Sequence, residues 1–121
     1  MLRQRQGRVA EAFGMFTRAL DDEPENLTML HELLGASYTS GRFAETEPYL
    51  KTYLMYHPVD PHILFSLAGL QYRMEKYSDA IDNLERLFEV EPAYEGGREL
   101  FVLVREALDG GGLSVGAAAL G

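Results

Sequence analysis

Residues 24–58 read PENLTMLHELLGASYTSGRFAETEPYLKTYLMYHP, a stretch that begins and ends with proline. Pro92 continues the series at the same interval, since 58 − 24 and 92 − 58 are both 34. At a proline frequency of about 5%, two further prolines in register are roughly a 1-in-400 coincidence. The interval therefore indicates an internal repeat, and repeats of this length are stacked units that cannot bury their apolar faces alone.

Each repeat shows helical spacing twice. Apolar residues recur at three- and four-residue steps before Gly41 and again after it: Leu27, Leu30, Leu33 and Leu34, then Phe43, Tyr49, Leu50, Tyr53 and Leu54. Asn26 and Asp60 precede the first helices and are predicted N-caps, because their side-chain oxygens can accept bonds from unpaired N–H groups. A repeat is thus predicted to be a helix, a tight turn and a second helix, which makes the fold class all-α.

The second-helix half carries a resemblance to a known family. Its pattern occurs three times: as Ala12-x3-Phe16 with Pro24, as Thr46-x3-Leu50 with Pro58, and as Ala80-x3-Leu84 with Pro92. This resembles the tetratricopeptide repeat, whose 34-residue unit follows W-x2-L-G-x2-Y, A-x3-F and P. The first-helix half is looser, with Leu30 and Leu64 in the tryptophan place. The resemblance covers about residues 1–108 and implies a right-handed superhelical solenoid of antiparallel helix pairs.

The register divides the chain into a partial repeat at 1–24, full repeats at 25–58 and 59–92, a terminal helix at 95–108 and a Gly-rich tail at 109–121. Gly7 lies 34 residues before Gly41, at the same position of the repeat; we call positions that are related in this way a column. Gly7 is therefore predicted to be a turn, with residues 1–6 as the end of a first helix. The chain is then expected to start in mid-repeat, as a fragment of a longer array or a protein that has lost its first helix would. The terminal helix is broadly apolar, which predicts that another repeat, a second copy or the tail covers it.

The tail has two interpretations. Its glycines suit a helix end followed by a flexible linker. Alternatively, Leu113, Val115 and Leu120 dock on an apolar surface.

Two residues depart from the pattern of the second helices. Pro48 lacks the N–H that would bond the carbonyl four residues earlier, which predicts a late helix start or a kink. Tyr53 stands where the preceding repeat has Ala19, and is expected to widen the packing between repeats. Family drift and a reshaped groove remain alternative explanations for both.

Composition limits the function classes. The chain has 121 residues, of which 46% are hydrophobic and 25% charged, as in an ordinary globular domain. It has no cysteine, which excludes disulfides, thiolate metal sites and cysteine nucleophiles. No signal peptide or membrane-spanning run is evident, so a soluble protein is expected, with the cytoplasm favoured.

Charge is unevenly placed along the chain. The net charge is −8, but residues 1–20 carry +3 (four arginines and Glu11), which leaves −11 for the rest. An acidic surface repels phosphate backbones, so nucleic acid is an unsuitable partner. A basic partner is the mild expectation.

Catalytic motifs are missing from the sequence: there is no Gly-rich phosphate loop, no H-E-x-x-H and no nucleophile elbow. His57, Asp60 and His62 could offer two imidazoles and a carboxylate to a metal, but they lie in a connection with two prolines and show no fourth ligand. Solvated turn residues are the favoured interpretation. Asp21, Asp22, Glu23 and Glu25 are likewise interpreted as a solvated surface rather than an acid–base pair. We therefore predict no catalysis, cofactor or metal.

The resemblance implies that first helices line a concave groove in which a peptide or partner helix lies. Carried over to this chain, the groove set comprises His31, Gly35, Tyr38, His62, Phe65, Gly69, Tyr72, Arg73, Glu99, Leu103 and Glu106, with Thr28 and Thr39 beside them. Gly35 and Gly69 cost helix propensity, about 1 kcal/mol each. They make room either for a ligand close to the backbone or for close helix–helix packing.

Two functions from different classes follow. The first is a protein-interaction module of a larger scaffold or adaptor, which binds a basic or amphipathic segment through aromatic contacts. Some family members hold a C-terminal carboxylate with Lys, Arg and Asn, but this groove set has one Arg and neither of the others. The second is a structural segment that self-associates into homo-oligomers through residues 95–121. An enzyme ranks last.

Overall fold

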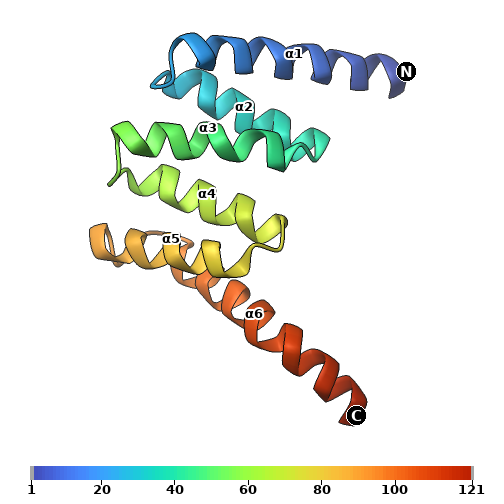
Figure 1. Ribbon diagram of the computed structural model, residues 1–121, viewed down its shortest axis with the longest axis vertical. Coiled ribbons are helices and arrows are strands. Elements are labelled where there is room, and N and C mark those ends of the chain that lie inside the picture. The colour runs from blue at the N-terminus through green and yellow to red at the C-terminus, as the bar shows by residue number, and fades with distance from the viewer. Residues whose placement is uncertain (1, 121) are drawn as a thin grey trace. The chain divides into compact units, whose positions relative to one another are not determined.

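The computed structural model describes the backbone of residues 2–120 and the side chains of residues 7–110. The described chain folds into six helices (Figure 1): α1 (Leu2–Asp22), α2 (Leu27–Ser40), α3 (Phe43–Tyr56), α4 (Pro61–Arg73), α5 (Tyr77–Val90) and α6 (Gly97–Leu120). They form two compact units, unit 1 (Met1–Pro58) and unit 2 (Val59–Gly121). Over the residues with described side chains, no helix is long and apolar enough to cross a membrane. The predicted all-α class is confirmed.

In unit 1, α2 packs against both α1 and α3. The predicted helical spacing accounts for most of the buried apolar residues, although the predicted Leu27 is 37% exposed and Phe13 was not predicted. The buried apolar residues are Phe13, Leu20, Leu30, Leu33, Leu34, Leu50, Tyr53 and Leu54. Asn26 is the predicted N-cap of α2, and its side chain accepts a bond of 3.1 Å from the Met29 N–H. Gly41 ends α2 with a φ of 76°, a left-handed conformation that glycine adopts without a Cβ penalty. The predicted turn at Gly41 is thus confirmed.

In unit 2, α5 packs against α4 and α6, and α6 also packs against α4. The buried apolar residues come from all three helices: Ile63, Leu64, Leu67, Ala68, Leu70, Ala80, Ile81, Leu84, Leu87 and Val104. Asp60 caps α4 as predicted, accepting bonds from the N–H groups of His62 (3.1 Å) and Ile63 (3.3 Å). Pro61 follows in the first turn, where its missing N–H removes no helical bond.

A buried polar pair joins the two helices of each full repeat. The hydroxyls of Ser37 and Thr46 bond α2 to α3, and the Asn83 amide donates to the Gln71 side chain over 2.8 Å between α5 and α4. Ser37 and Gln71 lie one repeat apart and occupy the same column. A buried polar group that loses its partner is costly, so these pairs favour the one alignment of the two helices in which both bonds are made.

The predicted turn at Gly7 is wrong. The helix α1 runs without interruption from Leu2 to Asp22 and contains Gly7. A single glycine costs a helix about 1 kcal/mol, which neighbouring helix formers can offset. Gly41, by contrast, adopts a left-handed conformation that breaks the helix. Residues 2–6 therefore extend the second helix of the partial repeat instead of ending a first one.

Two other features differ from expectation. The helix α3 begins at Phe43 with Pro48 inside it, so the late start, one of the two outcomes expected of this proline, is wrong. The sequence predicts a terminal helix at 95–108, whereas α6 runs from Gly97 to Leu120 and includes most of the predicted tail. The alanines of this segment, which favour helix, follow its glycines. The docking of Leu113, Val115 and Leu120 concerns side chains outside the described residues.

Candidate functional site

One side of α4 remains accessible while the other is buried. Ile63, Leu64, Leu67, Ala68, Leu70 and Gln71 are buried on one side of the helix. The other side carries five of the predicted groove residues, at helical spacing: His62, Phe65, Gly69, Tyr72 and Arg73. We call these five residues the α4 face. His62 and Arg73 are exposed at its ends, and the three residues between them are partly exposed.

The α4 face is held in place by Tyr94, which precedes α6. The Tyr94 hydroxyl and His62 Nδ1 are hydrogen bonded at 3.0 Å, and the rings of Tyr94 and Phe65 have centroids 5.0 Å apart. Tyr94 was missed from the sequence, although it lies one repeat after the cap residue Asp60. Asp60 caps α4, whereas Tyr94, at the same position of the next repeat, contacts His62 and Phe65 of α4.

The Tyr94 hydroxyl sits in an environment that favours its neutral form. Burial raises the pKa of Tyr94, and the carboxylates of Glu91, Asp60 and Glu95 raise it further. Burial and nearby negative charge both disfavour the phenolate. The neutral hydroxyl is the form that shares the hydrogen bond with His62.

Tyr72 is the second aromatic side chain of the α4 face. Its ring lies 6.0 Å, centroid to centroid, from that of Tyr77, and it is partly exposed. Phe65, by contrast, is packed against Tyr94. Phe65 thus has a role in holding α4 beside the start of α6, whereas Tyr72 offers an aromatic surface that a ligand can contact.

The predicted residues of α6 lie on one side of that helix. Glu99, Leu103 and Glu106 follow each other at four- and three-residue steps and are all exposed. Their helix packs against α4 within unit 2. They add an apolar residue and two carboxylates to the accessible surface of this unit.

Unit 1 carries an equivalent set, which we call the α2 face: Thr28, His31, Gly35, Tyr38 and Thr39, all of them exposed. Each lies one repeat before a member of the α4 face, so Gly35 matches Gly69 and Tyr38 matches Tyr72. The Tyr38 ring packs edge-on against Phe43, with centroids 5.3 Å apart. The two faces are thus two copies of one pattern, and each belongs to its own unit.

The glycine of the α2 face has space around it. A Cβ built on Gly35 would meet no other heavy atom of the described residues within 4 Å. Of the two explanations for this glycine, close packing between helices of the described chain therefore has no support. Room for an external ligand remains.

Replacing Gly35 by alanine is expected to stabilise unit 1 by about 1 kcal/mol, because alanine favours helix and its methyl group meets no obstacle. Guanidinium denaturation followed by circular dichroism measures this change. A loss of stability would show that the glycine is required for packing.

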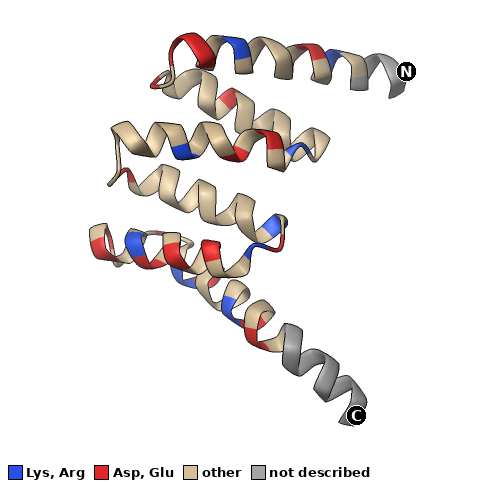
Figure 2. Ribbon diagram, in the orientation of Figure 1, with Lys and Arg blue, Asp and Glu red and all other residues tan. Residues whose placement is uncertain are grey.

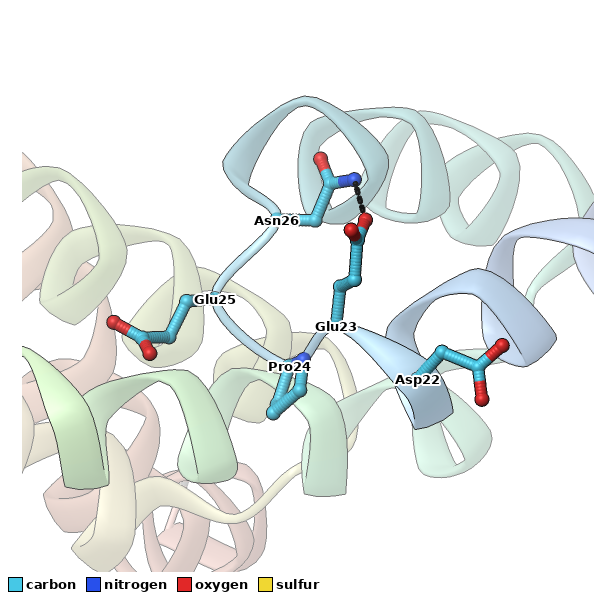
Figure 3. Close-up of a pocket in the computed structure, with 5 residues that line it drawn as sticks. All are labelled: Asp22, Glu23, Pro24, Glu25 and Asn26. Atoms are coloured by element: carbon cyan, nitrogen blue, oxygen red, sulfur yellow. Dashed lines mark hydrogen bonds between the residues drawn. The ribbon is translucent and has the colours of Figure 1, made fainter.

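The turn between α1 and α2 forms a shallow hollow lined by Asp22, Glu23, Pro24, Glu25 and Asn26 (Figure 3). Glu23 accepts a bond of 2.9 Å from the Asn26 amide. The side chains of Asp22 and Glu25 point away from each other in this view, so they do not form an acid–base pair. The hollow is an acidic surface of the turn.

The histidines of the α3–α4 connection have separate partners. His57 Nε2 lies 2.9 Å from Glu25 Oε1, and its ring stacks on Tyr53 with centroids 4.7 Å apart. His62 bonds Tyr94 in unit 2. Among the residues with described side chains, no three His, Cys, Asp or Glu lie close enough together to hold a metal ion.

Acidic side chains gather on α5. Asp79, Asp82, Glu85 and Glu89 are all exposed at three- and four-residue steps, and Figure 2 shows the helix with several red segments. The α4 face, in contrast, contains one arginine and no carboxylate. The accessible surface of unit 2 therefore includes an aromatic stripe on α4 and an acidic side of α5.

Comparison with known proteins matches the helices to one kind of domain. No family model matches the chain, and no curated protein matches it by sequence. Among solved structures, the first TPR of Spaghetti (RPAP3) bound to the HSP90 peptide SRMEEVD is similar, with a TM-score of 0.71 and 20% identity over 87% of this chain and 83% of that one. The first TPR domain of human RPAP3 gives the same values.

The protein MamA is also similar, with a TM-score of 0.71 and 18% identity. The match covers 88% of this chain and 58% of the MamA chain. At these identities the likeness concerns the arrangement of helices, which is the arrangement that the repeat pattern predicts. The chain therefore has the tetratricopeptide-repeat fold.

Proposed function

We propose that this chain is a protein-interaction module whose α4 face binds a peptide or a partner helix. The observation that carries the proposal is the α4 face itself, an aromatic stripe left accessible on a helix whose other side is buried. A rigid helix supported by α5 and α6 presents these side chains at little further entropic cost.

The residue types of the α4 face suit peptide recognition. Tyrosine and arginine are enriched among residues that dominate binding energies, because each combines a large contact area with polar groups. Gly69 is partly exposed between Phe65 and Tyr72 and has no side chain that would keep a ligand away from the helix backbone. The α2 face repeats the same pattern in unit 1 and offers a second surface of the same kind.

The charges favour a basic or amphipathic partner. The chain has a net charge of −8, and Glu99 and Glu106 are exposed on α6. The peptide in the RPAP3 structure, SRMEEVD, ends with three acidic residues among its last four. The α4 face has one arginine and neither lysine nor asparagine with which to hold such a peptide, so a different sequence class is proposed here.

Selection from a phage-displayed library of random 12-residue peptides provides the probe. Fluorescence polarisation then compares the selected peptide on wild type, Tyr72→Ala and the control Tyr56→Ala. Tyr56 is 55% exposed at the end of α3 and outside both faces. We expect Tyr72→Ala to weaken binding about tenfold or more and Tyr56→Ala to leave it unchanged, since truncating an aromatic anchor costs about 2 kcal/mol. Equal affinity for all three proteins would refute the proposal.

Self-association through α6 is the second candidate. Val102 and Leu103 are 47% and 49% exposed on this helix, so part of its apolar surface is available to a second copy. Light scattering over a hundredfold range of protein concentration tests it, since a constant monomer mass would exclude self-association.

A further inference from the structure

Two pairs of aromatic rings involve the α4 face, one on either side of Gly69 along the helix. The first pair is Phe65 with Tyr94, whose ring centroids are 5.0 Å apart and whose planes are inclined by 40°. The second pair is Tyr72 with Tyr77, the first residue of α5, at 6.0 Å and 48°. All four aromatic residues and Gly69 are partly exposed. Unit 2 thus presents two aromatic pairs of similar geometry, with a residue that has no side chain between them.

The spacing of the two pairs along α4 is close to one turn of a polyproline II helix. Phe65 and Tyr72 are seven residues apart, which is about two turns of an α-helix and about 10.5 Å along its axis. In polyproline II every third residue points the same way, and three residues rise about 9.3 Å. Residues on one side of a β-strand instead recur at about 6.6 Å and about 13 Å, which fits the spacing less well. Two residues three apart in a polyproline II segment can therefore contact one aromatic pair each.

The hydrogen-bonding groups favour such a segment over a partner helix. The polar side chains of the α4 face, which are His62, Tyr72 and Arg73, can all donate hydrogen bonds, and the face has no carboxylate. Tyr77 adds a further hydroxyl beside Tyr72. The carbonyl groups of a polyproline II segment have no partner within the segment, whereas those of an α-helix are bonded internally. A surface of donors therefore suits a backbone that offers acceptors.

We infer that the ligand of the α4 face is a proline-rich segment in the polyproline II conformation, with prolines three residues apart packed on the two aromatic pairs. This inference rests on the function proposed above and names the class of peptide. The proline ring is compact and apolar, and its fixed φ orders the segment before binding, which lowers the entropic cost. Aromatic surfaces recognise proline-rich segments in other kinds of domain. Gly69 allows the segment to approach the helix between the two pairs.

Charge predicts basic residues beside the prolines. Residues 59–121 contain 11 acidic and five basic residues, a net charge of 5 − 11 = −6. At the first aromatic pair, the carboxylates of Asp60, Glu91 and Glu95 lie close enough to raise the pKa of the Tyr94 hydroxyl. The surroundings of the second pair are mixed, since residues 73–79 include two basic and two acidic side chains. A lysine or arginine next to the prolines is therefore attracted to the Tyr94 end of the face.

A ten-residue peptide tests the inference, with lysine at each end and Pro-Pro-Ala-Pro-Pro-Ala-Pro-Pro between them. Acetylated and amidated, with a fluorophore at one end, it is titrated with the full chain and read by fluorescence polarisation. The control peptide has alanine in place of every proline, so it has the same charge but favours the α-helix. We expect the proline peptide to bind with a Kd below about 1 mM and the alanine peptide to bind about tenfold more weakly or worse.

Tyr77→Ala removes one ring of the second pair and leaves the α4 face itself intact. Tyr77 is partly exposed at the start of α5, so the variant is expected to fold, which circular dichroism verifies. The proline peptide should bind this variant about fivefold more weakly or worse. Tyr77→Phe keeps the ring and should retain most of the affinity. Tyr56→Ala should bind like wild type, because Tyr56 is 55% exposed at the end of α3 and outside both faces.

Three results would overturn the inference: no binding of the proline peptide at protein concentrations up to about 1 mM, equal affinity for the alanine peptide, or unchanged affinity in Tyr77→Ala. The proposed function fails separately. If the library-selected peptide loses affinity in Tyr72→Ala while the proline peptide does not bind, the α4 face is a binding site for another class of segment and only the inference is wrong. If Tyr72→Ala leaves the library-selected peptide unaffected, the proposed function itself is wrong.

Discussion

Replacing Leu84 by alanine is expected to lower the free energy of unfolding by about 3 kcal/mol. Leu84 is 0% exposed in α5, and α5 packs against both other helices of unit 2. The substitution shortens a fully buried side chain and leaves a cavity that close-packed neighbours fill incompletely. A domain of this size is typically stable by about 5–15 kcal/mol, so the loss is a large fraction of the total.

Guanidinium denaturation followed by circular dichroism measures the effect, and Leu108→Ala is the control. Leu108 lies in α6 of the same unit and is 38% exposed. Its truncation should cost less than about 1 kcal/mol, since little apolar surface is withdrawn from water there. Equal losses of unfolding free energy for Leu84→Ala and Leu108→Ala would contradict the burial of Leu84 in the core of unit 2.

Gly96→Ala is expected to destabilise unit 2 by about 2 kcal/mol. Gly96 has a φ of 85°, a left-handed conformation that costs a residue with a Cβ about 1–2 kcal/mol. The added methyl group would also lie 3.3 Å from Phe65 Cζ, so the ring, which contacts Tyr94, must move by a few tenths of an ångström. A binding surface that includes Phe65 should lose affinity together with stability.

Gly35→Ala is the comparison for this variant, because the same substitution is made at a helical glycine with open space around it. The two variants should change the midpoint of denaturation in opposite directions, downward for Gly96→Ala and upward for Gly35→Ala. A neutral or stabilising Gly96→Ala would show that the turn before α6 adopts another conformation in solution.

The repeat pattern was sufficient to predict the helices between Asn26 and Val90. In this region the caps Asn26 and Asp60, the left-handed Gly41 and the helical spacing of apolar residues all indicate the same helix boundaries. A sequence pattern is reliable when its local signals point to one structure. The five residues of the α4 face were predicted from the resemblance to the repeat family, and in the structure they lie on the side of α4 opposite its buried residues.

The ends of the chain were predicted less well. Gly7 and Gly41 are both glycines, but Gly7 lies inside a helix whereas Gly41 has a positive φ. The presence of a glycine alone does not reveal which of these conformations it adopts. Tyr94 was missed because its contacts with Phe65 and His62 join segments far apart in the sequence and replace a capping role with packing. Side-chain contacts at that separation leave no periodic signal.

The partial exposure of Ala12 and Phe16 could not be obtained from the sequence either. Both match the repeat pattern better than their equivalents Thr46 and Leu50 in α3, and a good match predicts burial. Thr46 and Leu50 are nevertheless buried, whereas Ala12 and Phe16 are partly exposed.

The binding of a peptide at the α4 face is the central claim, and amide chemical-shift mapping tests it most directly. The library-selected peptide is titrated into ¹⁵N-labelled protein, and shifts are followed for α4 and for the acidic side of α5. We predict that the largest shifts fall between Phe65 and Arg73, with Gly69 and Tyr72 among them. Shifts confined to the α5 residues between Asp79 and Glu89 would contradict the claim, because the acidic surface and not the aromatic stripe would then be the site.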